Sequence, residues 1–346
     1  MARPIGRPPA PAKQGLRARP KGVAVYFADV GQGDCTIVVT AAQHAALVVD
    51  CTDLPQALDI LEGAGSPDLT VLVSHWHRDH VAGVAGLLQN YQGKIRGLHC
   101  NLFPQLRHDS ETVGASHVHS HTVYWMVKAA TDRDAGLVGA RAGDTLLAGD
   151  GARATAIYPT DGELGEAIKK QDLNEACVLV EVRYGTSAVL LGADLPAHQW
   201  LRLADEGRLS PAVAIKVPHH GVRSPRDFAH ALAAVVAPDV AVVSVGTTNT
   251  YGHPDKDCLR QWAAVSRVMC TEVTESCSPG ALPDREDVLS RLKSVPFQSA
   301  TGGCPCAGTV LVELRPNGYA VHPPLGEHRR VMALFSSPQC RQEAPE

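Results

Sequence analysis

The sequence of 346 residues contains no run of about 18 apolar residues, the length that a membrane-crossing helix needs. No apolar segment follows the basic, proline-rich residues 1–21, so we expect a disordered tail there rather than a secretory signal. Without such a signal, the ten cysteines indicate a cytoplasmic protein with mostly reduced thiols. We expect no membrane partner.

Aromatic residues are scarce, at 5% of the chain, although hydrophobic residues reach 45%. We therefore expect a core of Ala, Val and Leu in one large domain or two small ones. The net charge of −4 argues against a protein that coats nucleic acid, but it is compatible with a local basic groove. The sequence also lacks the G-x-G-x-x-G fingerprint of dinucleotide-binding folds and the G-x-S-x-G elbow of serine hydrolases.

Short apolar runs with the composition of strands alternate with segments that have helical spacing. The clearest predicted strands are residues 23–30, 69–74 and 213–217 and the hairpins at 177–194 and 308–323. Helices are predicted at 54–65 and 255–266. Strand-rich halves with interspersed helices indicate an α/β protein in which two sheets are sandwiched between helices.

The most informative segment is SHWHRDHVAG, which directly follows the buried strand 69–74. It places His75, His77, Asp79 and His80 within six residues. Imidazole and carboxylate groups bind zinc and similar divalent ions, and a strand end is a rigid support for them. The first two histidines can hold one ion, while the aspartate and the last histidine hold a second ion nearby.

The string HWHRDHVAG resembles the H-x-H-x-D-H signature of the metallo-β-lactamase superfamily. Two further segments precede this string, DVGQGDCTIVV and VVDCT, and three occur after it in this order: LLGADL, KVPHHGVRSP and VSVGTTNTYGHP. Together they are similar to the soluble nuclease-like domain of the DNA-uptake protein ComEC and its stand-alone relatives. The resemblance implies an αββα sandwich over residues 22–325, with insertions around 95–145 and 270–303 and a C-terminal tail at 326–346.

The same resemblance implies the remaining metal ligands. Asp194 in LLGAD matches the aspartate that bridges both metals in the family. The last ligand lies in PHHG, where His219 is favoured because it follows the strand more closely. His220 would then contact substrate or hydrogen-bond a ligand.

A third histidine for the first metal is missing from the window where the family usually has one. Asn174 stands there, as an asparagine does in the ComEC-like branch. The alternative donors are three histidines in the 95–145 region, His117, His119 and His121, although their spacing does not place them on one helical face.

The resemblance also implies second-shell or substrate contacts around the site, from Asp34, Asn249, Tyr251 and His253. Asp34 would orient a ligating histidine. For Asp29 and Asp50 ordinary turn chemistry is an equally good interpretation.

Four cysteines near the end of the sequence form a second candidate metal site, in two close pairs: Cys270, Cys277, Cys304 and Cys306. Their spacing is not that of a standard zinc ribbon. A structural metal, a disulfide and free buried thiols therefore remain alternatives.

We predict a metal-dependent hydrolase, a phosphodiesterase or nuclease that uses two divalent ions and a metal-bound hydroxide. The ions would be zinc, with manganese as the alternative. Asp79 would share the proton of the attacking water, and His220 or His253 would protonate the leaving oxygen. The substrate would be nucleic acid or another phosphodiester.

The preference for a phosphodiester comes from the resemblance, because the metals alone do not select a substrate. Lys216, Arg223 and Arg226 flank the PHHG loop and could meet phosphates, or form a solvated edge. The competing hypotheses are a hydrolase of small esters, thioesters or lactones, and a non-catalytic metal-binding sensor module.

Overall fold

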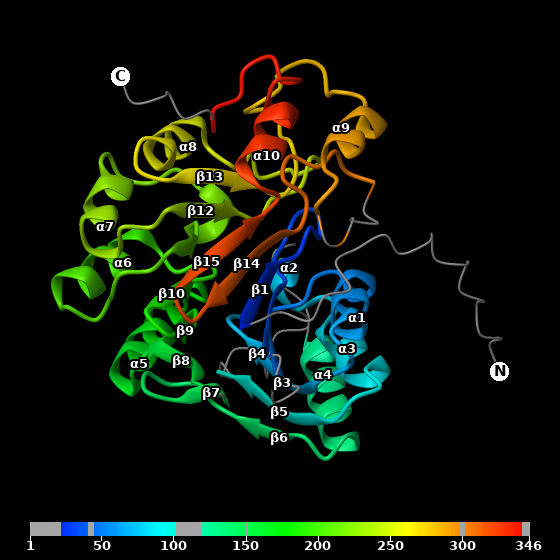
Figure 1. The fold of residues 1–346 in the computed structure, drawn as a ribbon. Coiled ribbons are helices and arrows are strands. Elements are labelled where there is room, and N and C mark those ends of the chain that lie inside the picture. The colour runs from blue at the N-terminus through cyan, green and yellow to red at the C-terminus, as the bar shows by residue number, and fades with distance from the viewer. Residues whose placement is uncertain are drawn as a thin grey trace.

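The computed structural model describes residues 22–40, 45–101, 120–149, 151–295, 297 and 302–340. Two mixed sheets face each other, and helices cover their outer faces (Figure 1). This arrangement confirms the predicted αββα sandwich. The predicted tail at residues 1–21 lies outside the described residues.

The first sheet has the strand order β15-β14-β1-β2-β3-β4-β5-β6. Its strands from β3 to β6 are parallel, and the others are antiparallel. The bounds are β1 (Val23–Phe27), β2 (Thr36–Thr40), β3 (Ala45–Val49), β4 (Asp68–Val73), β5 (Ile95–Cys100), β6 (Gly136–Val138), β14 (Val310–Arg315) and β15 (Gly318–His322).

The second sheet has the order β13-β12-β11-β10-β9-β8-β7. Its strands from β10 to β13 are parallel, and β7 to β10 are antiparallel. The bounds are β7 (Thr145–Gly149), β8 (Ala152–Tyr158), β9 (Leu179–Tyr184), β10 (Ser187–Leu191), β11 (Ala214–Lys216), β12 (Val240–Val243) and β13 (Arg267–Cys270).

Ten α-helices and two 3-10 turns connect the strands of the described part. They are α1 (Leu54–Gly63), α2 (Arg78–Val81), α3 (Val84–Asn90), α4 (Ser120–Asp132), α5 (Asp161–Lys170), η2 (Asn174–Ala176), α6 (Ala197–Asp205), η3 (Pro218–Gly221), α7 (Phe228–Val236), α8 (Lys256–Ala263), α9 (Arg285–Arg291) and α10 (Leu325–Met332). Among the described residues, no helix is long and apolar enough to span a membrane.

The core has three apolar layers, because alternate residues of each strand point to opposite faces. One layer lies between the sheets and contains Val25, Leu72 and Val180. A second joins the first sheet to α1, α3 and α4, and a third joins the second sheet to α6, α7 and α8. The two sheets therefore fix each other, and their strand ends become a rigid support for the loops beyond them.

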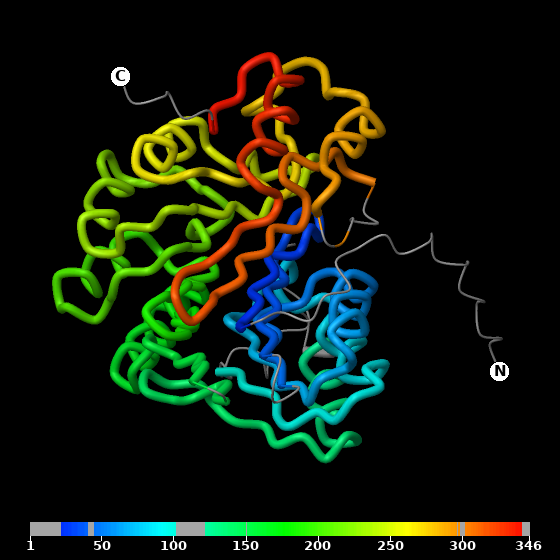
Figure 2. The backbone as a smooth tube through the Cα atoms, viewed as in Figure 1, coloured from blue at the N-terminus to red at the C-terminus, as the bar shows by residue number. Residues whose placement is uncertain are grey.

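Helices α9 and α10 lie at one end of the molecule, the upper end in Figure 2, whereas β14 and β15 extend along the first sheet. The chain does not become a tail at 326, because Val331, Phe335 and Cys340 are buried in the same apolar layer as β13. Likewise, the described parts of 95–145 are β5, β6 and α4, which belong to the first sheet and its covering layer. The prediction of an insertion and a tail came from the resemblance, whose motifs all lie outside these two segments.

Glu163 at the start of α5 joins two segments of the second half. It completes a capping box with Thr160 and forms ion pairs with Arg202 on α6 and with Arg208. Burial raises its pKa, but Arg208, Thr160 and Arg202 outweigh that effect and lower the pKa from 4.5 to about 2. The carboxylate therefore stabilises the fold above pH 4.5, and this contribution is lost as pH falls toward 2.

Glu163→Gln should lower the free energy of unfolding by about 2 kcal/mol at pH 7, since it removes charge-assisted hydrogen bonds. The difference from the parent protein should shrink as the pH falls toward 2. Chemical denaturation at several pH values measures it, with Glu166→Gln as the control, since Glu166 pairs only with the exposed Lys169 among the ion pairs of the described region. Equal effects of the two variants would contradict this account.

Candidate metal centre

Segments that follow three strands bring histidines and a carboxylate together at one edge of the sandwich. The loop after β4 leads into α2 and carries His75, His77 and His80, while Asp194 follows β10. His220 lies in η3, directly after β11. The site is therefore built from segments more than a hundred residues apart in sequence.

The side chains form two groups of potential ligand atoms that share Asp194. The first contains His75, His77 and Asp194, and the second contains Asp34, His80, Asp194 and His220. Within each group the ligand atoms lie within 4.8 Å of one another. In the first group, His75 Nε2 and His77 Nδ1 are 2.9 Å apart, so both ring nitrogens face the same point.

Asp50 fixes the orientation of His80. Its carboxylate accepts hydrogen bonds from Ser74 N at 2.7 Å, from Ser74 Oγ at 2.6 Å and from His80 Nδ1 at 2.7 Å. With Nδ1 held by Asp50, the Nε2 of the ring points toward Asp194 Oδ2, 3.3 Å away. A carboxylate behind a histidine is the usual support for a metal-ligating imidazole.

The backbone carbonyl of Ser244 fixes the orientation of His220. Its Nδ1 donates to Ser244 O at 2.8 Å, and its Nε2 lies 3.6 Å from Asp194 Oδ1 and 3.4 Å from Asp79 Oδ2. His219 and His220 both have positive φ, at 50° and 52°, which is an unfavourable conformation for residues with a β-carbon. This turn aims the buried His220 ring into the second group.

His219 occupies the other side of Asp194. Its Nε2 is 3.6 Å from Asp194 Oδ2, and its side chain keeps 30% of its surface exposed. The sequence favoured His219 as the ligand, whereas the structure puts His220 in the second group and leaves His219 partly facing solvent. The difference arises because the left-handed turn reverses the expected direction of the two rings.

Asp79 lies at the margin of the second group. Burial raises its pKa, but His220 and His80 outweigh burial and hold the pKa well below its usual value. Its backbone carbonyl accepts from Asp34 N at 2.9 Å, which joins the histidine loop to the loop after β1. The carboxylate is therefore ionised, and its Oδ2 lies 3.4 Å from His220 Nε2.

The shared carboxylate is ionised too. Burial raises the pKa of Asp194, but His80 and His220 outweigh it and keep the pKa well below the usual range. Burial lowers the pKa of His75 strongly, so its ring is neutral and offers a lone pair.

These residues fit divalent cations. His80 Nε2, His220 Nε2 and Asp194 Oδ1 are buried without a hydrogen-bond partner among the described residues. Such atoms cost about 1–3 kcal/mol each when nothing binds them. Nitrogen and oxygen donors in two groups with one common carboxylate satisfy the requirements of two neighbouring ions.

Lys216 is buried directly beneath this site. Its Nζ pairs with Asp34 Oδ2 at 2.7 Å and donates to Ala193 O at 3.3 Å. The interpretation of Lys216 as a phosphate contact or a solvated strand edge is therefore wrong. Because one oxygen of Asp34 is taken by Lys216, and His80 Nδ1 is 3.5 Å from the same oxygen, the geometry favours Asp34 as an orienting group.

Three candidate residues lie in the loop after β12. Asn249 shapes this loop, because its side chain bonds Gly246 O and both the N–H and the carbonyl of His253. Tyr251 is 53% exposed and stacks on His253, and the His253 ring lies 5.6 Å from that of His219. His219, His253 and Tyr251 therefore form a row that runs from the site toward solvent.

Asn174 begins η2, which leads into a segment tied to the histidine loop by the hydrogen bond from Val178 N to Ser74 O. Its Oδ1 is buried without a partner among the described residues. His117 and His119 lie outside the described residues, and the side chain of His121 is also outside them.

The four candidate cysteines do not form one cluster. All are buried and free, and Cys304 Sγ donates to Pro283 O at 3.8 Å. Cys306 instead contacts His328 Nε2 at 3.3 Å, a residue that sequence reasoning missed. For Asp50 the sequence left turn chemistry and a contact with the site as alternatives, and the structure shows the contact with His80.

No protein-family model matches the chain. No curated protein matches its sequence. Solved structures match at low similarity. The metallo-β-lactamase fold protein YhfI from Bacillus subtilis is 11% identical over 71% of this chain and 96% of that one, with a TM-score of 0.42.

Zn²⁺-bound PqqB from Methylobacterium extorquens is 12% identical over 72% of this chain and 97% of its own, with a TM-score of 0.40. A diphosphatase of the PhnP family is 14% identical over 68% and 81%, with a TM-score of 0.36. Similarities of this size do not argue for a shared activity. The functional interpretation therefore rests on the geometry of the site.

Asp50→Asn should weaken metal binding by about 10- to 100-fold, because the amide no longer fixes His80 as the carboxylate does. Competition with a chromophoric chelator measures the affinity. The exposed Asp205 at the end of α6 provides the control Asp205→Asn. Unchanged affinity in Asp50→Asn would show that His80 needs no such support.

His220→Ala should reduce the metal content of the Asp194 centre from two ions to one per chain, whereas His219→Ala should leave both. Elemental analysis of dialysed protein gives the number of metal ions per chain, and the difference from the parent protein gives the number lost from this centre. His230→Ala, a change at an exposed position of α7, controls for the loss of an imidazole. Loss of an ion from His219→Ala and not from His220→Ala would reverse the assignment.

Proposed function

We propose that the protein is a metal-dependent hydrolase that acts on a phosphodiester, with nucleic acid as the substrate class. The observation that carries the proposal is the pair of buried ligand groups that share Asp194. His75, His77 and Asp194 would hold one ion, and His80, His220 and Asp194 the other, with Asp79 at its margin. Divalent ions in this arrangement acidify water and stabilise negative charge on an oxygen.

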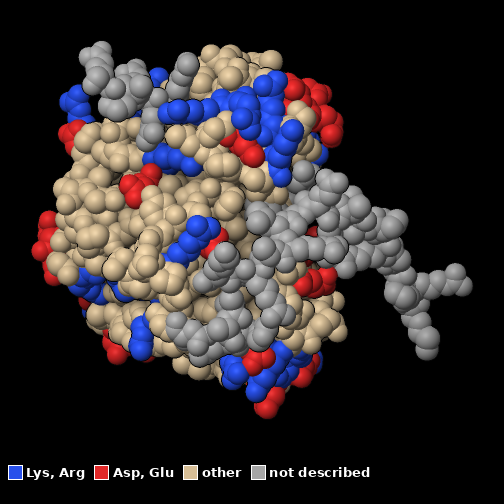
Figure 3. Space-filling view, viewed as in Figure 1, with Lys and Arg blue, Asp and Glu red and all other residues tan. Residues whose placement is uncertain are grey.

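Three arginines support a phosphate-containing substrate. Arg78 lies inside the histidine motif, and Arg223 and Arg226 follow the PHHG turn; all three are exposed. Their guanidinium groups suit phosphate oxygens. On the face in Figure 3 the basic side chains of the described residues form separate groups. Arg78, Arg223 and Arg226 would each contact a phosphate oxygen of the substrate.

A hollow beside His219 offers space for part of a substrate. Its volume is about 170 Å³, and Arg223, Ser224 and His219 line it together with the apolar Phe228 and Trp262. A lining that combines polar groups with aromatic rings suits a phosphate joined to a flat base.

His219 and His253 are the side chains that would face substrate. Burial is the main cause that lowers the pKa of each, and the neighbouring His219 and His220 add to it for His253. Both rings are therefore mainly neutral at pH 7 and can donate one N–H to a substrate oxygen. Tyr251 holds His253 by stacking and lies farther out.

The order of the motifs supports a relation to the ComEC-like nuclease branch, which is part of this proposal. Zinc, with manganese as the alternative, suits the nitrogen and oxygen donors. A cytoplasmic location is also proposed, and the ten free, buried cysteines are compatible with a reducing compartment.

The activity test uses the purified full chain loaded with zinc or manganese. The substrates are bis(p-nitrophenyl) phosphate, single-stranded and duplex DNA, RNA, nitrocefin and a thioester. We expect hydrolysis of phosphodiesters, reduced about 1,000-fold by Asp194→Asn, because metal ions supply several kcal/mol of stabilisation. Asp205→Asn should retain full activity.

Two outcomes would contradict the proposal. Turnover of the thioester or nitrocefin alone would exclude the phosphodiester and support the small-molecule alternative. Two bound ions without turnover of any substrate would support the sensor hypothesis.

A further inference from the structure

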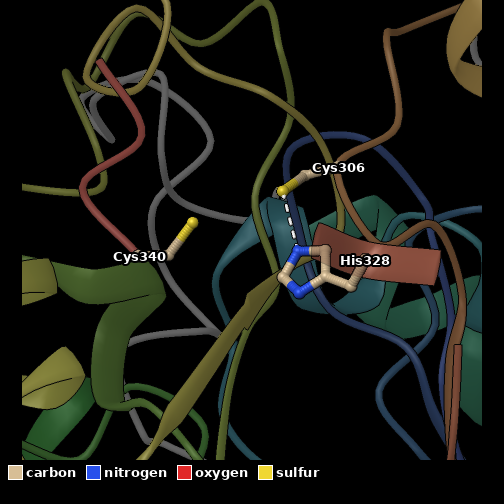
Figure 4. Close-up of side chains that lie close together, drawn as sticks. All are labelled: Cys306, His328 and Cys340. Atoms are coloured by element: carbon tan, nitrogen blue, oxygen red, sulfur yellow. Dashed lines mark hydrogen bonds between the residues drawn. The ribbon is translucent and has the colours of Figure 1, made fainter. Parts of the chain in front are cut away.

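A third group of metal-ligating side chains lies outside the two groups around Asp194. It contains Cys306, His328 and Cys340, which are all buried and have ligand atoms within 4.8 Å of one another. Cys306 precedes β14, His328 lies on α10, and Cys340 ends the described chain. Figure 4 shows the three side chains converging on one space from separate segments.

The spacing of the donors suits a small tetrahedral ion. Cys306 Sγ and His328 Nε2 are 3.3 Å apart. With Zn–S near 2.3 Å and Zn–N near 2.0–2.1 Å, a tetrahedral site separates sulfur and nitrogen by about 3.5 Å. The observed separation therefore needs little adjustment to accept an ion.

Cys277 is a candidate for the fourth ligand. It neighbours Cys340 but lies outside the group of three, whose ligand atoms are within 4.8 Å of one another. The backbone also joins these segments, because Ser337 N donates to Cys277 O at 3.2 Å. Three thiols and one imidazole are a donor set found in structural zinc sites.

His328 is poorly satisfied without an ion. The residue is 0% exposed, its Nδ1 has no hydrogen-bond partner among the described residues, and its Nε2 meets only a thiol, which is a weak partner. Burial lowers the pKa of His328 to about 3, so the ring is neutral and has a lone pair to offer. A buried imidazole among thiols is costly in an apolar core and favourable as a ligand.

We propose that Cys306, His328 and Cys340, with Cys277 as the fourth ligand, form a structural site for a zinc-like divalent ion. Binding would release the protons of the three thiols to solvent. The site would join α10 and the end of the described chain to the loops before β14.

The fold links this site to the Asp194 centre. Cys304, two residues from Cys306, donates its N–H to Thr247 Oγ1 at 3.0 Å. Thr247 lies in the loop after β12, whose Ser244 carbonyl orients His220. An ion held by Cys306 would therefore steady the loop on which His220 depends.

Cobalt substitution tests the proposal, since thiolates bound to Co²⁺ give a near-ultraviolet charge-transfer band that histidine and carboxylate ligands do not. The full chain is stripped of metal and titrated with Co²⁺. We expect the band in the parent protein and also in Asp194→Asn, in which the other centre is disrupted. Cys306→Ser should remove about one third of the band or more, because one of three thiolates is lost. Cys304→Ser should leave it unchanged.

A second measurement remains informative if Cys306→Ser does not fold. Titration of the zinc-loaded Asp194→Asn protein with a mercurial reagent should release one zinc as the thiols react. Absence of the cobalt band in the parent protein, an equal loss in Cys304→Ser, or a disulfide found by intact mass under non-reducing conditions would overturn the proposal. None of these results depends on whether the protein hydrolyses a phosphodiester.

Discussion

The buried carboxylate of Asp194 is the group on which the rest of the site depends. Its two oxygens face the imidazoles of His75 and His80 on one side and that of His220 on the other. In a low-dielectric interior an ionised carboxylate needs cations or strong donors close by. The neighbouring imidazoles meet part of that need, and two divalent ions would meet the rest.

The fold makes this arrangement rigid. Each ligand loop starts at the end of a strand whose side chains are buried between two sheets or under helices. The histidines are then fixed individually, His80 by the Asp50 carboxylate and His220 by the Ser244 carbonyl. Such positioning lowers the reorganisation needed when an ion binds. Lys216 adds a fixed positive charge beneath Asp34 and keeps that carboxylate in place.

Strand and helix patterns predicted two sheets between helices, because they are local signals. The clustering of the histidine motif with Asp194 was implied by the resemblance to a known family. The sequence did not predict which of His219 and His220 turns inward, since that depends on two successive residues with positive φ. Nor did it show that Lys216 is buried, because a lysine at a strand end is usually solvated.

The sequence also did not predict which cysteines come together in the fold. Their pairing in sequence suggested one cluster, whereas the structure joins Cys306 to residues 22 and 34 positions further along the chain. These contacts join segments that are distant in sequence and depend on the packing of α10, so no short spacing pattern predicts them.

Anomalous diffraction from crystals of the purified protein, collected at the zinc or manganese edge, tests the central claim most directly. At the Asp194 centre we expect two peaks, one on each side of the carboxylate, with His75 and His77 at the first and His80 and His220 at the second. If crystals are grown with either metal in excess and no peak lies within bonding distance of Asp194, the two-ion centre is contradicted.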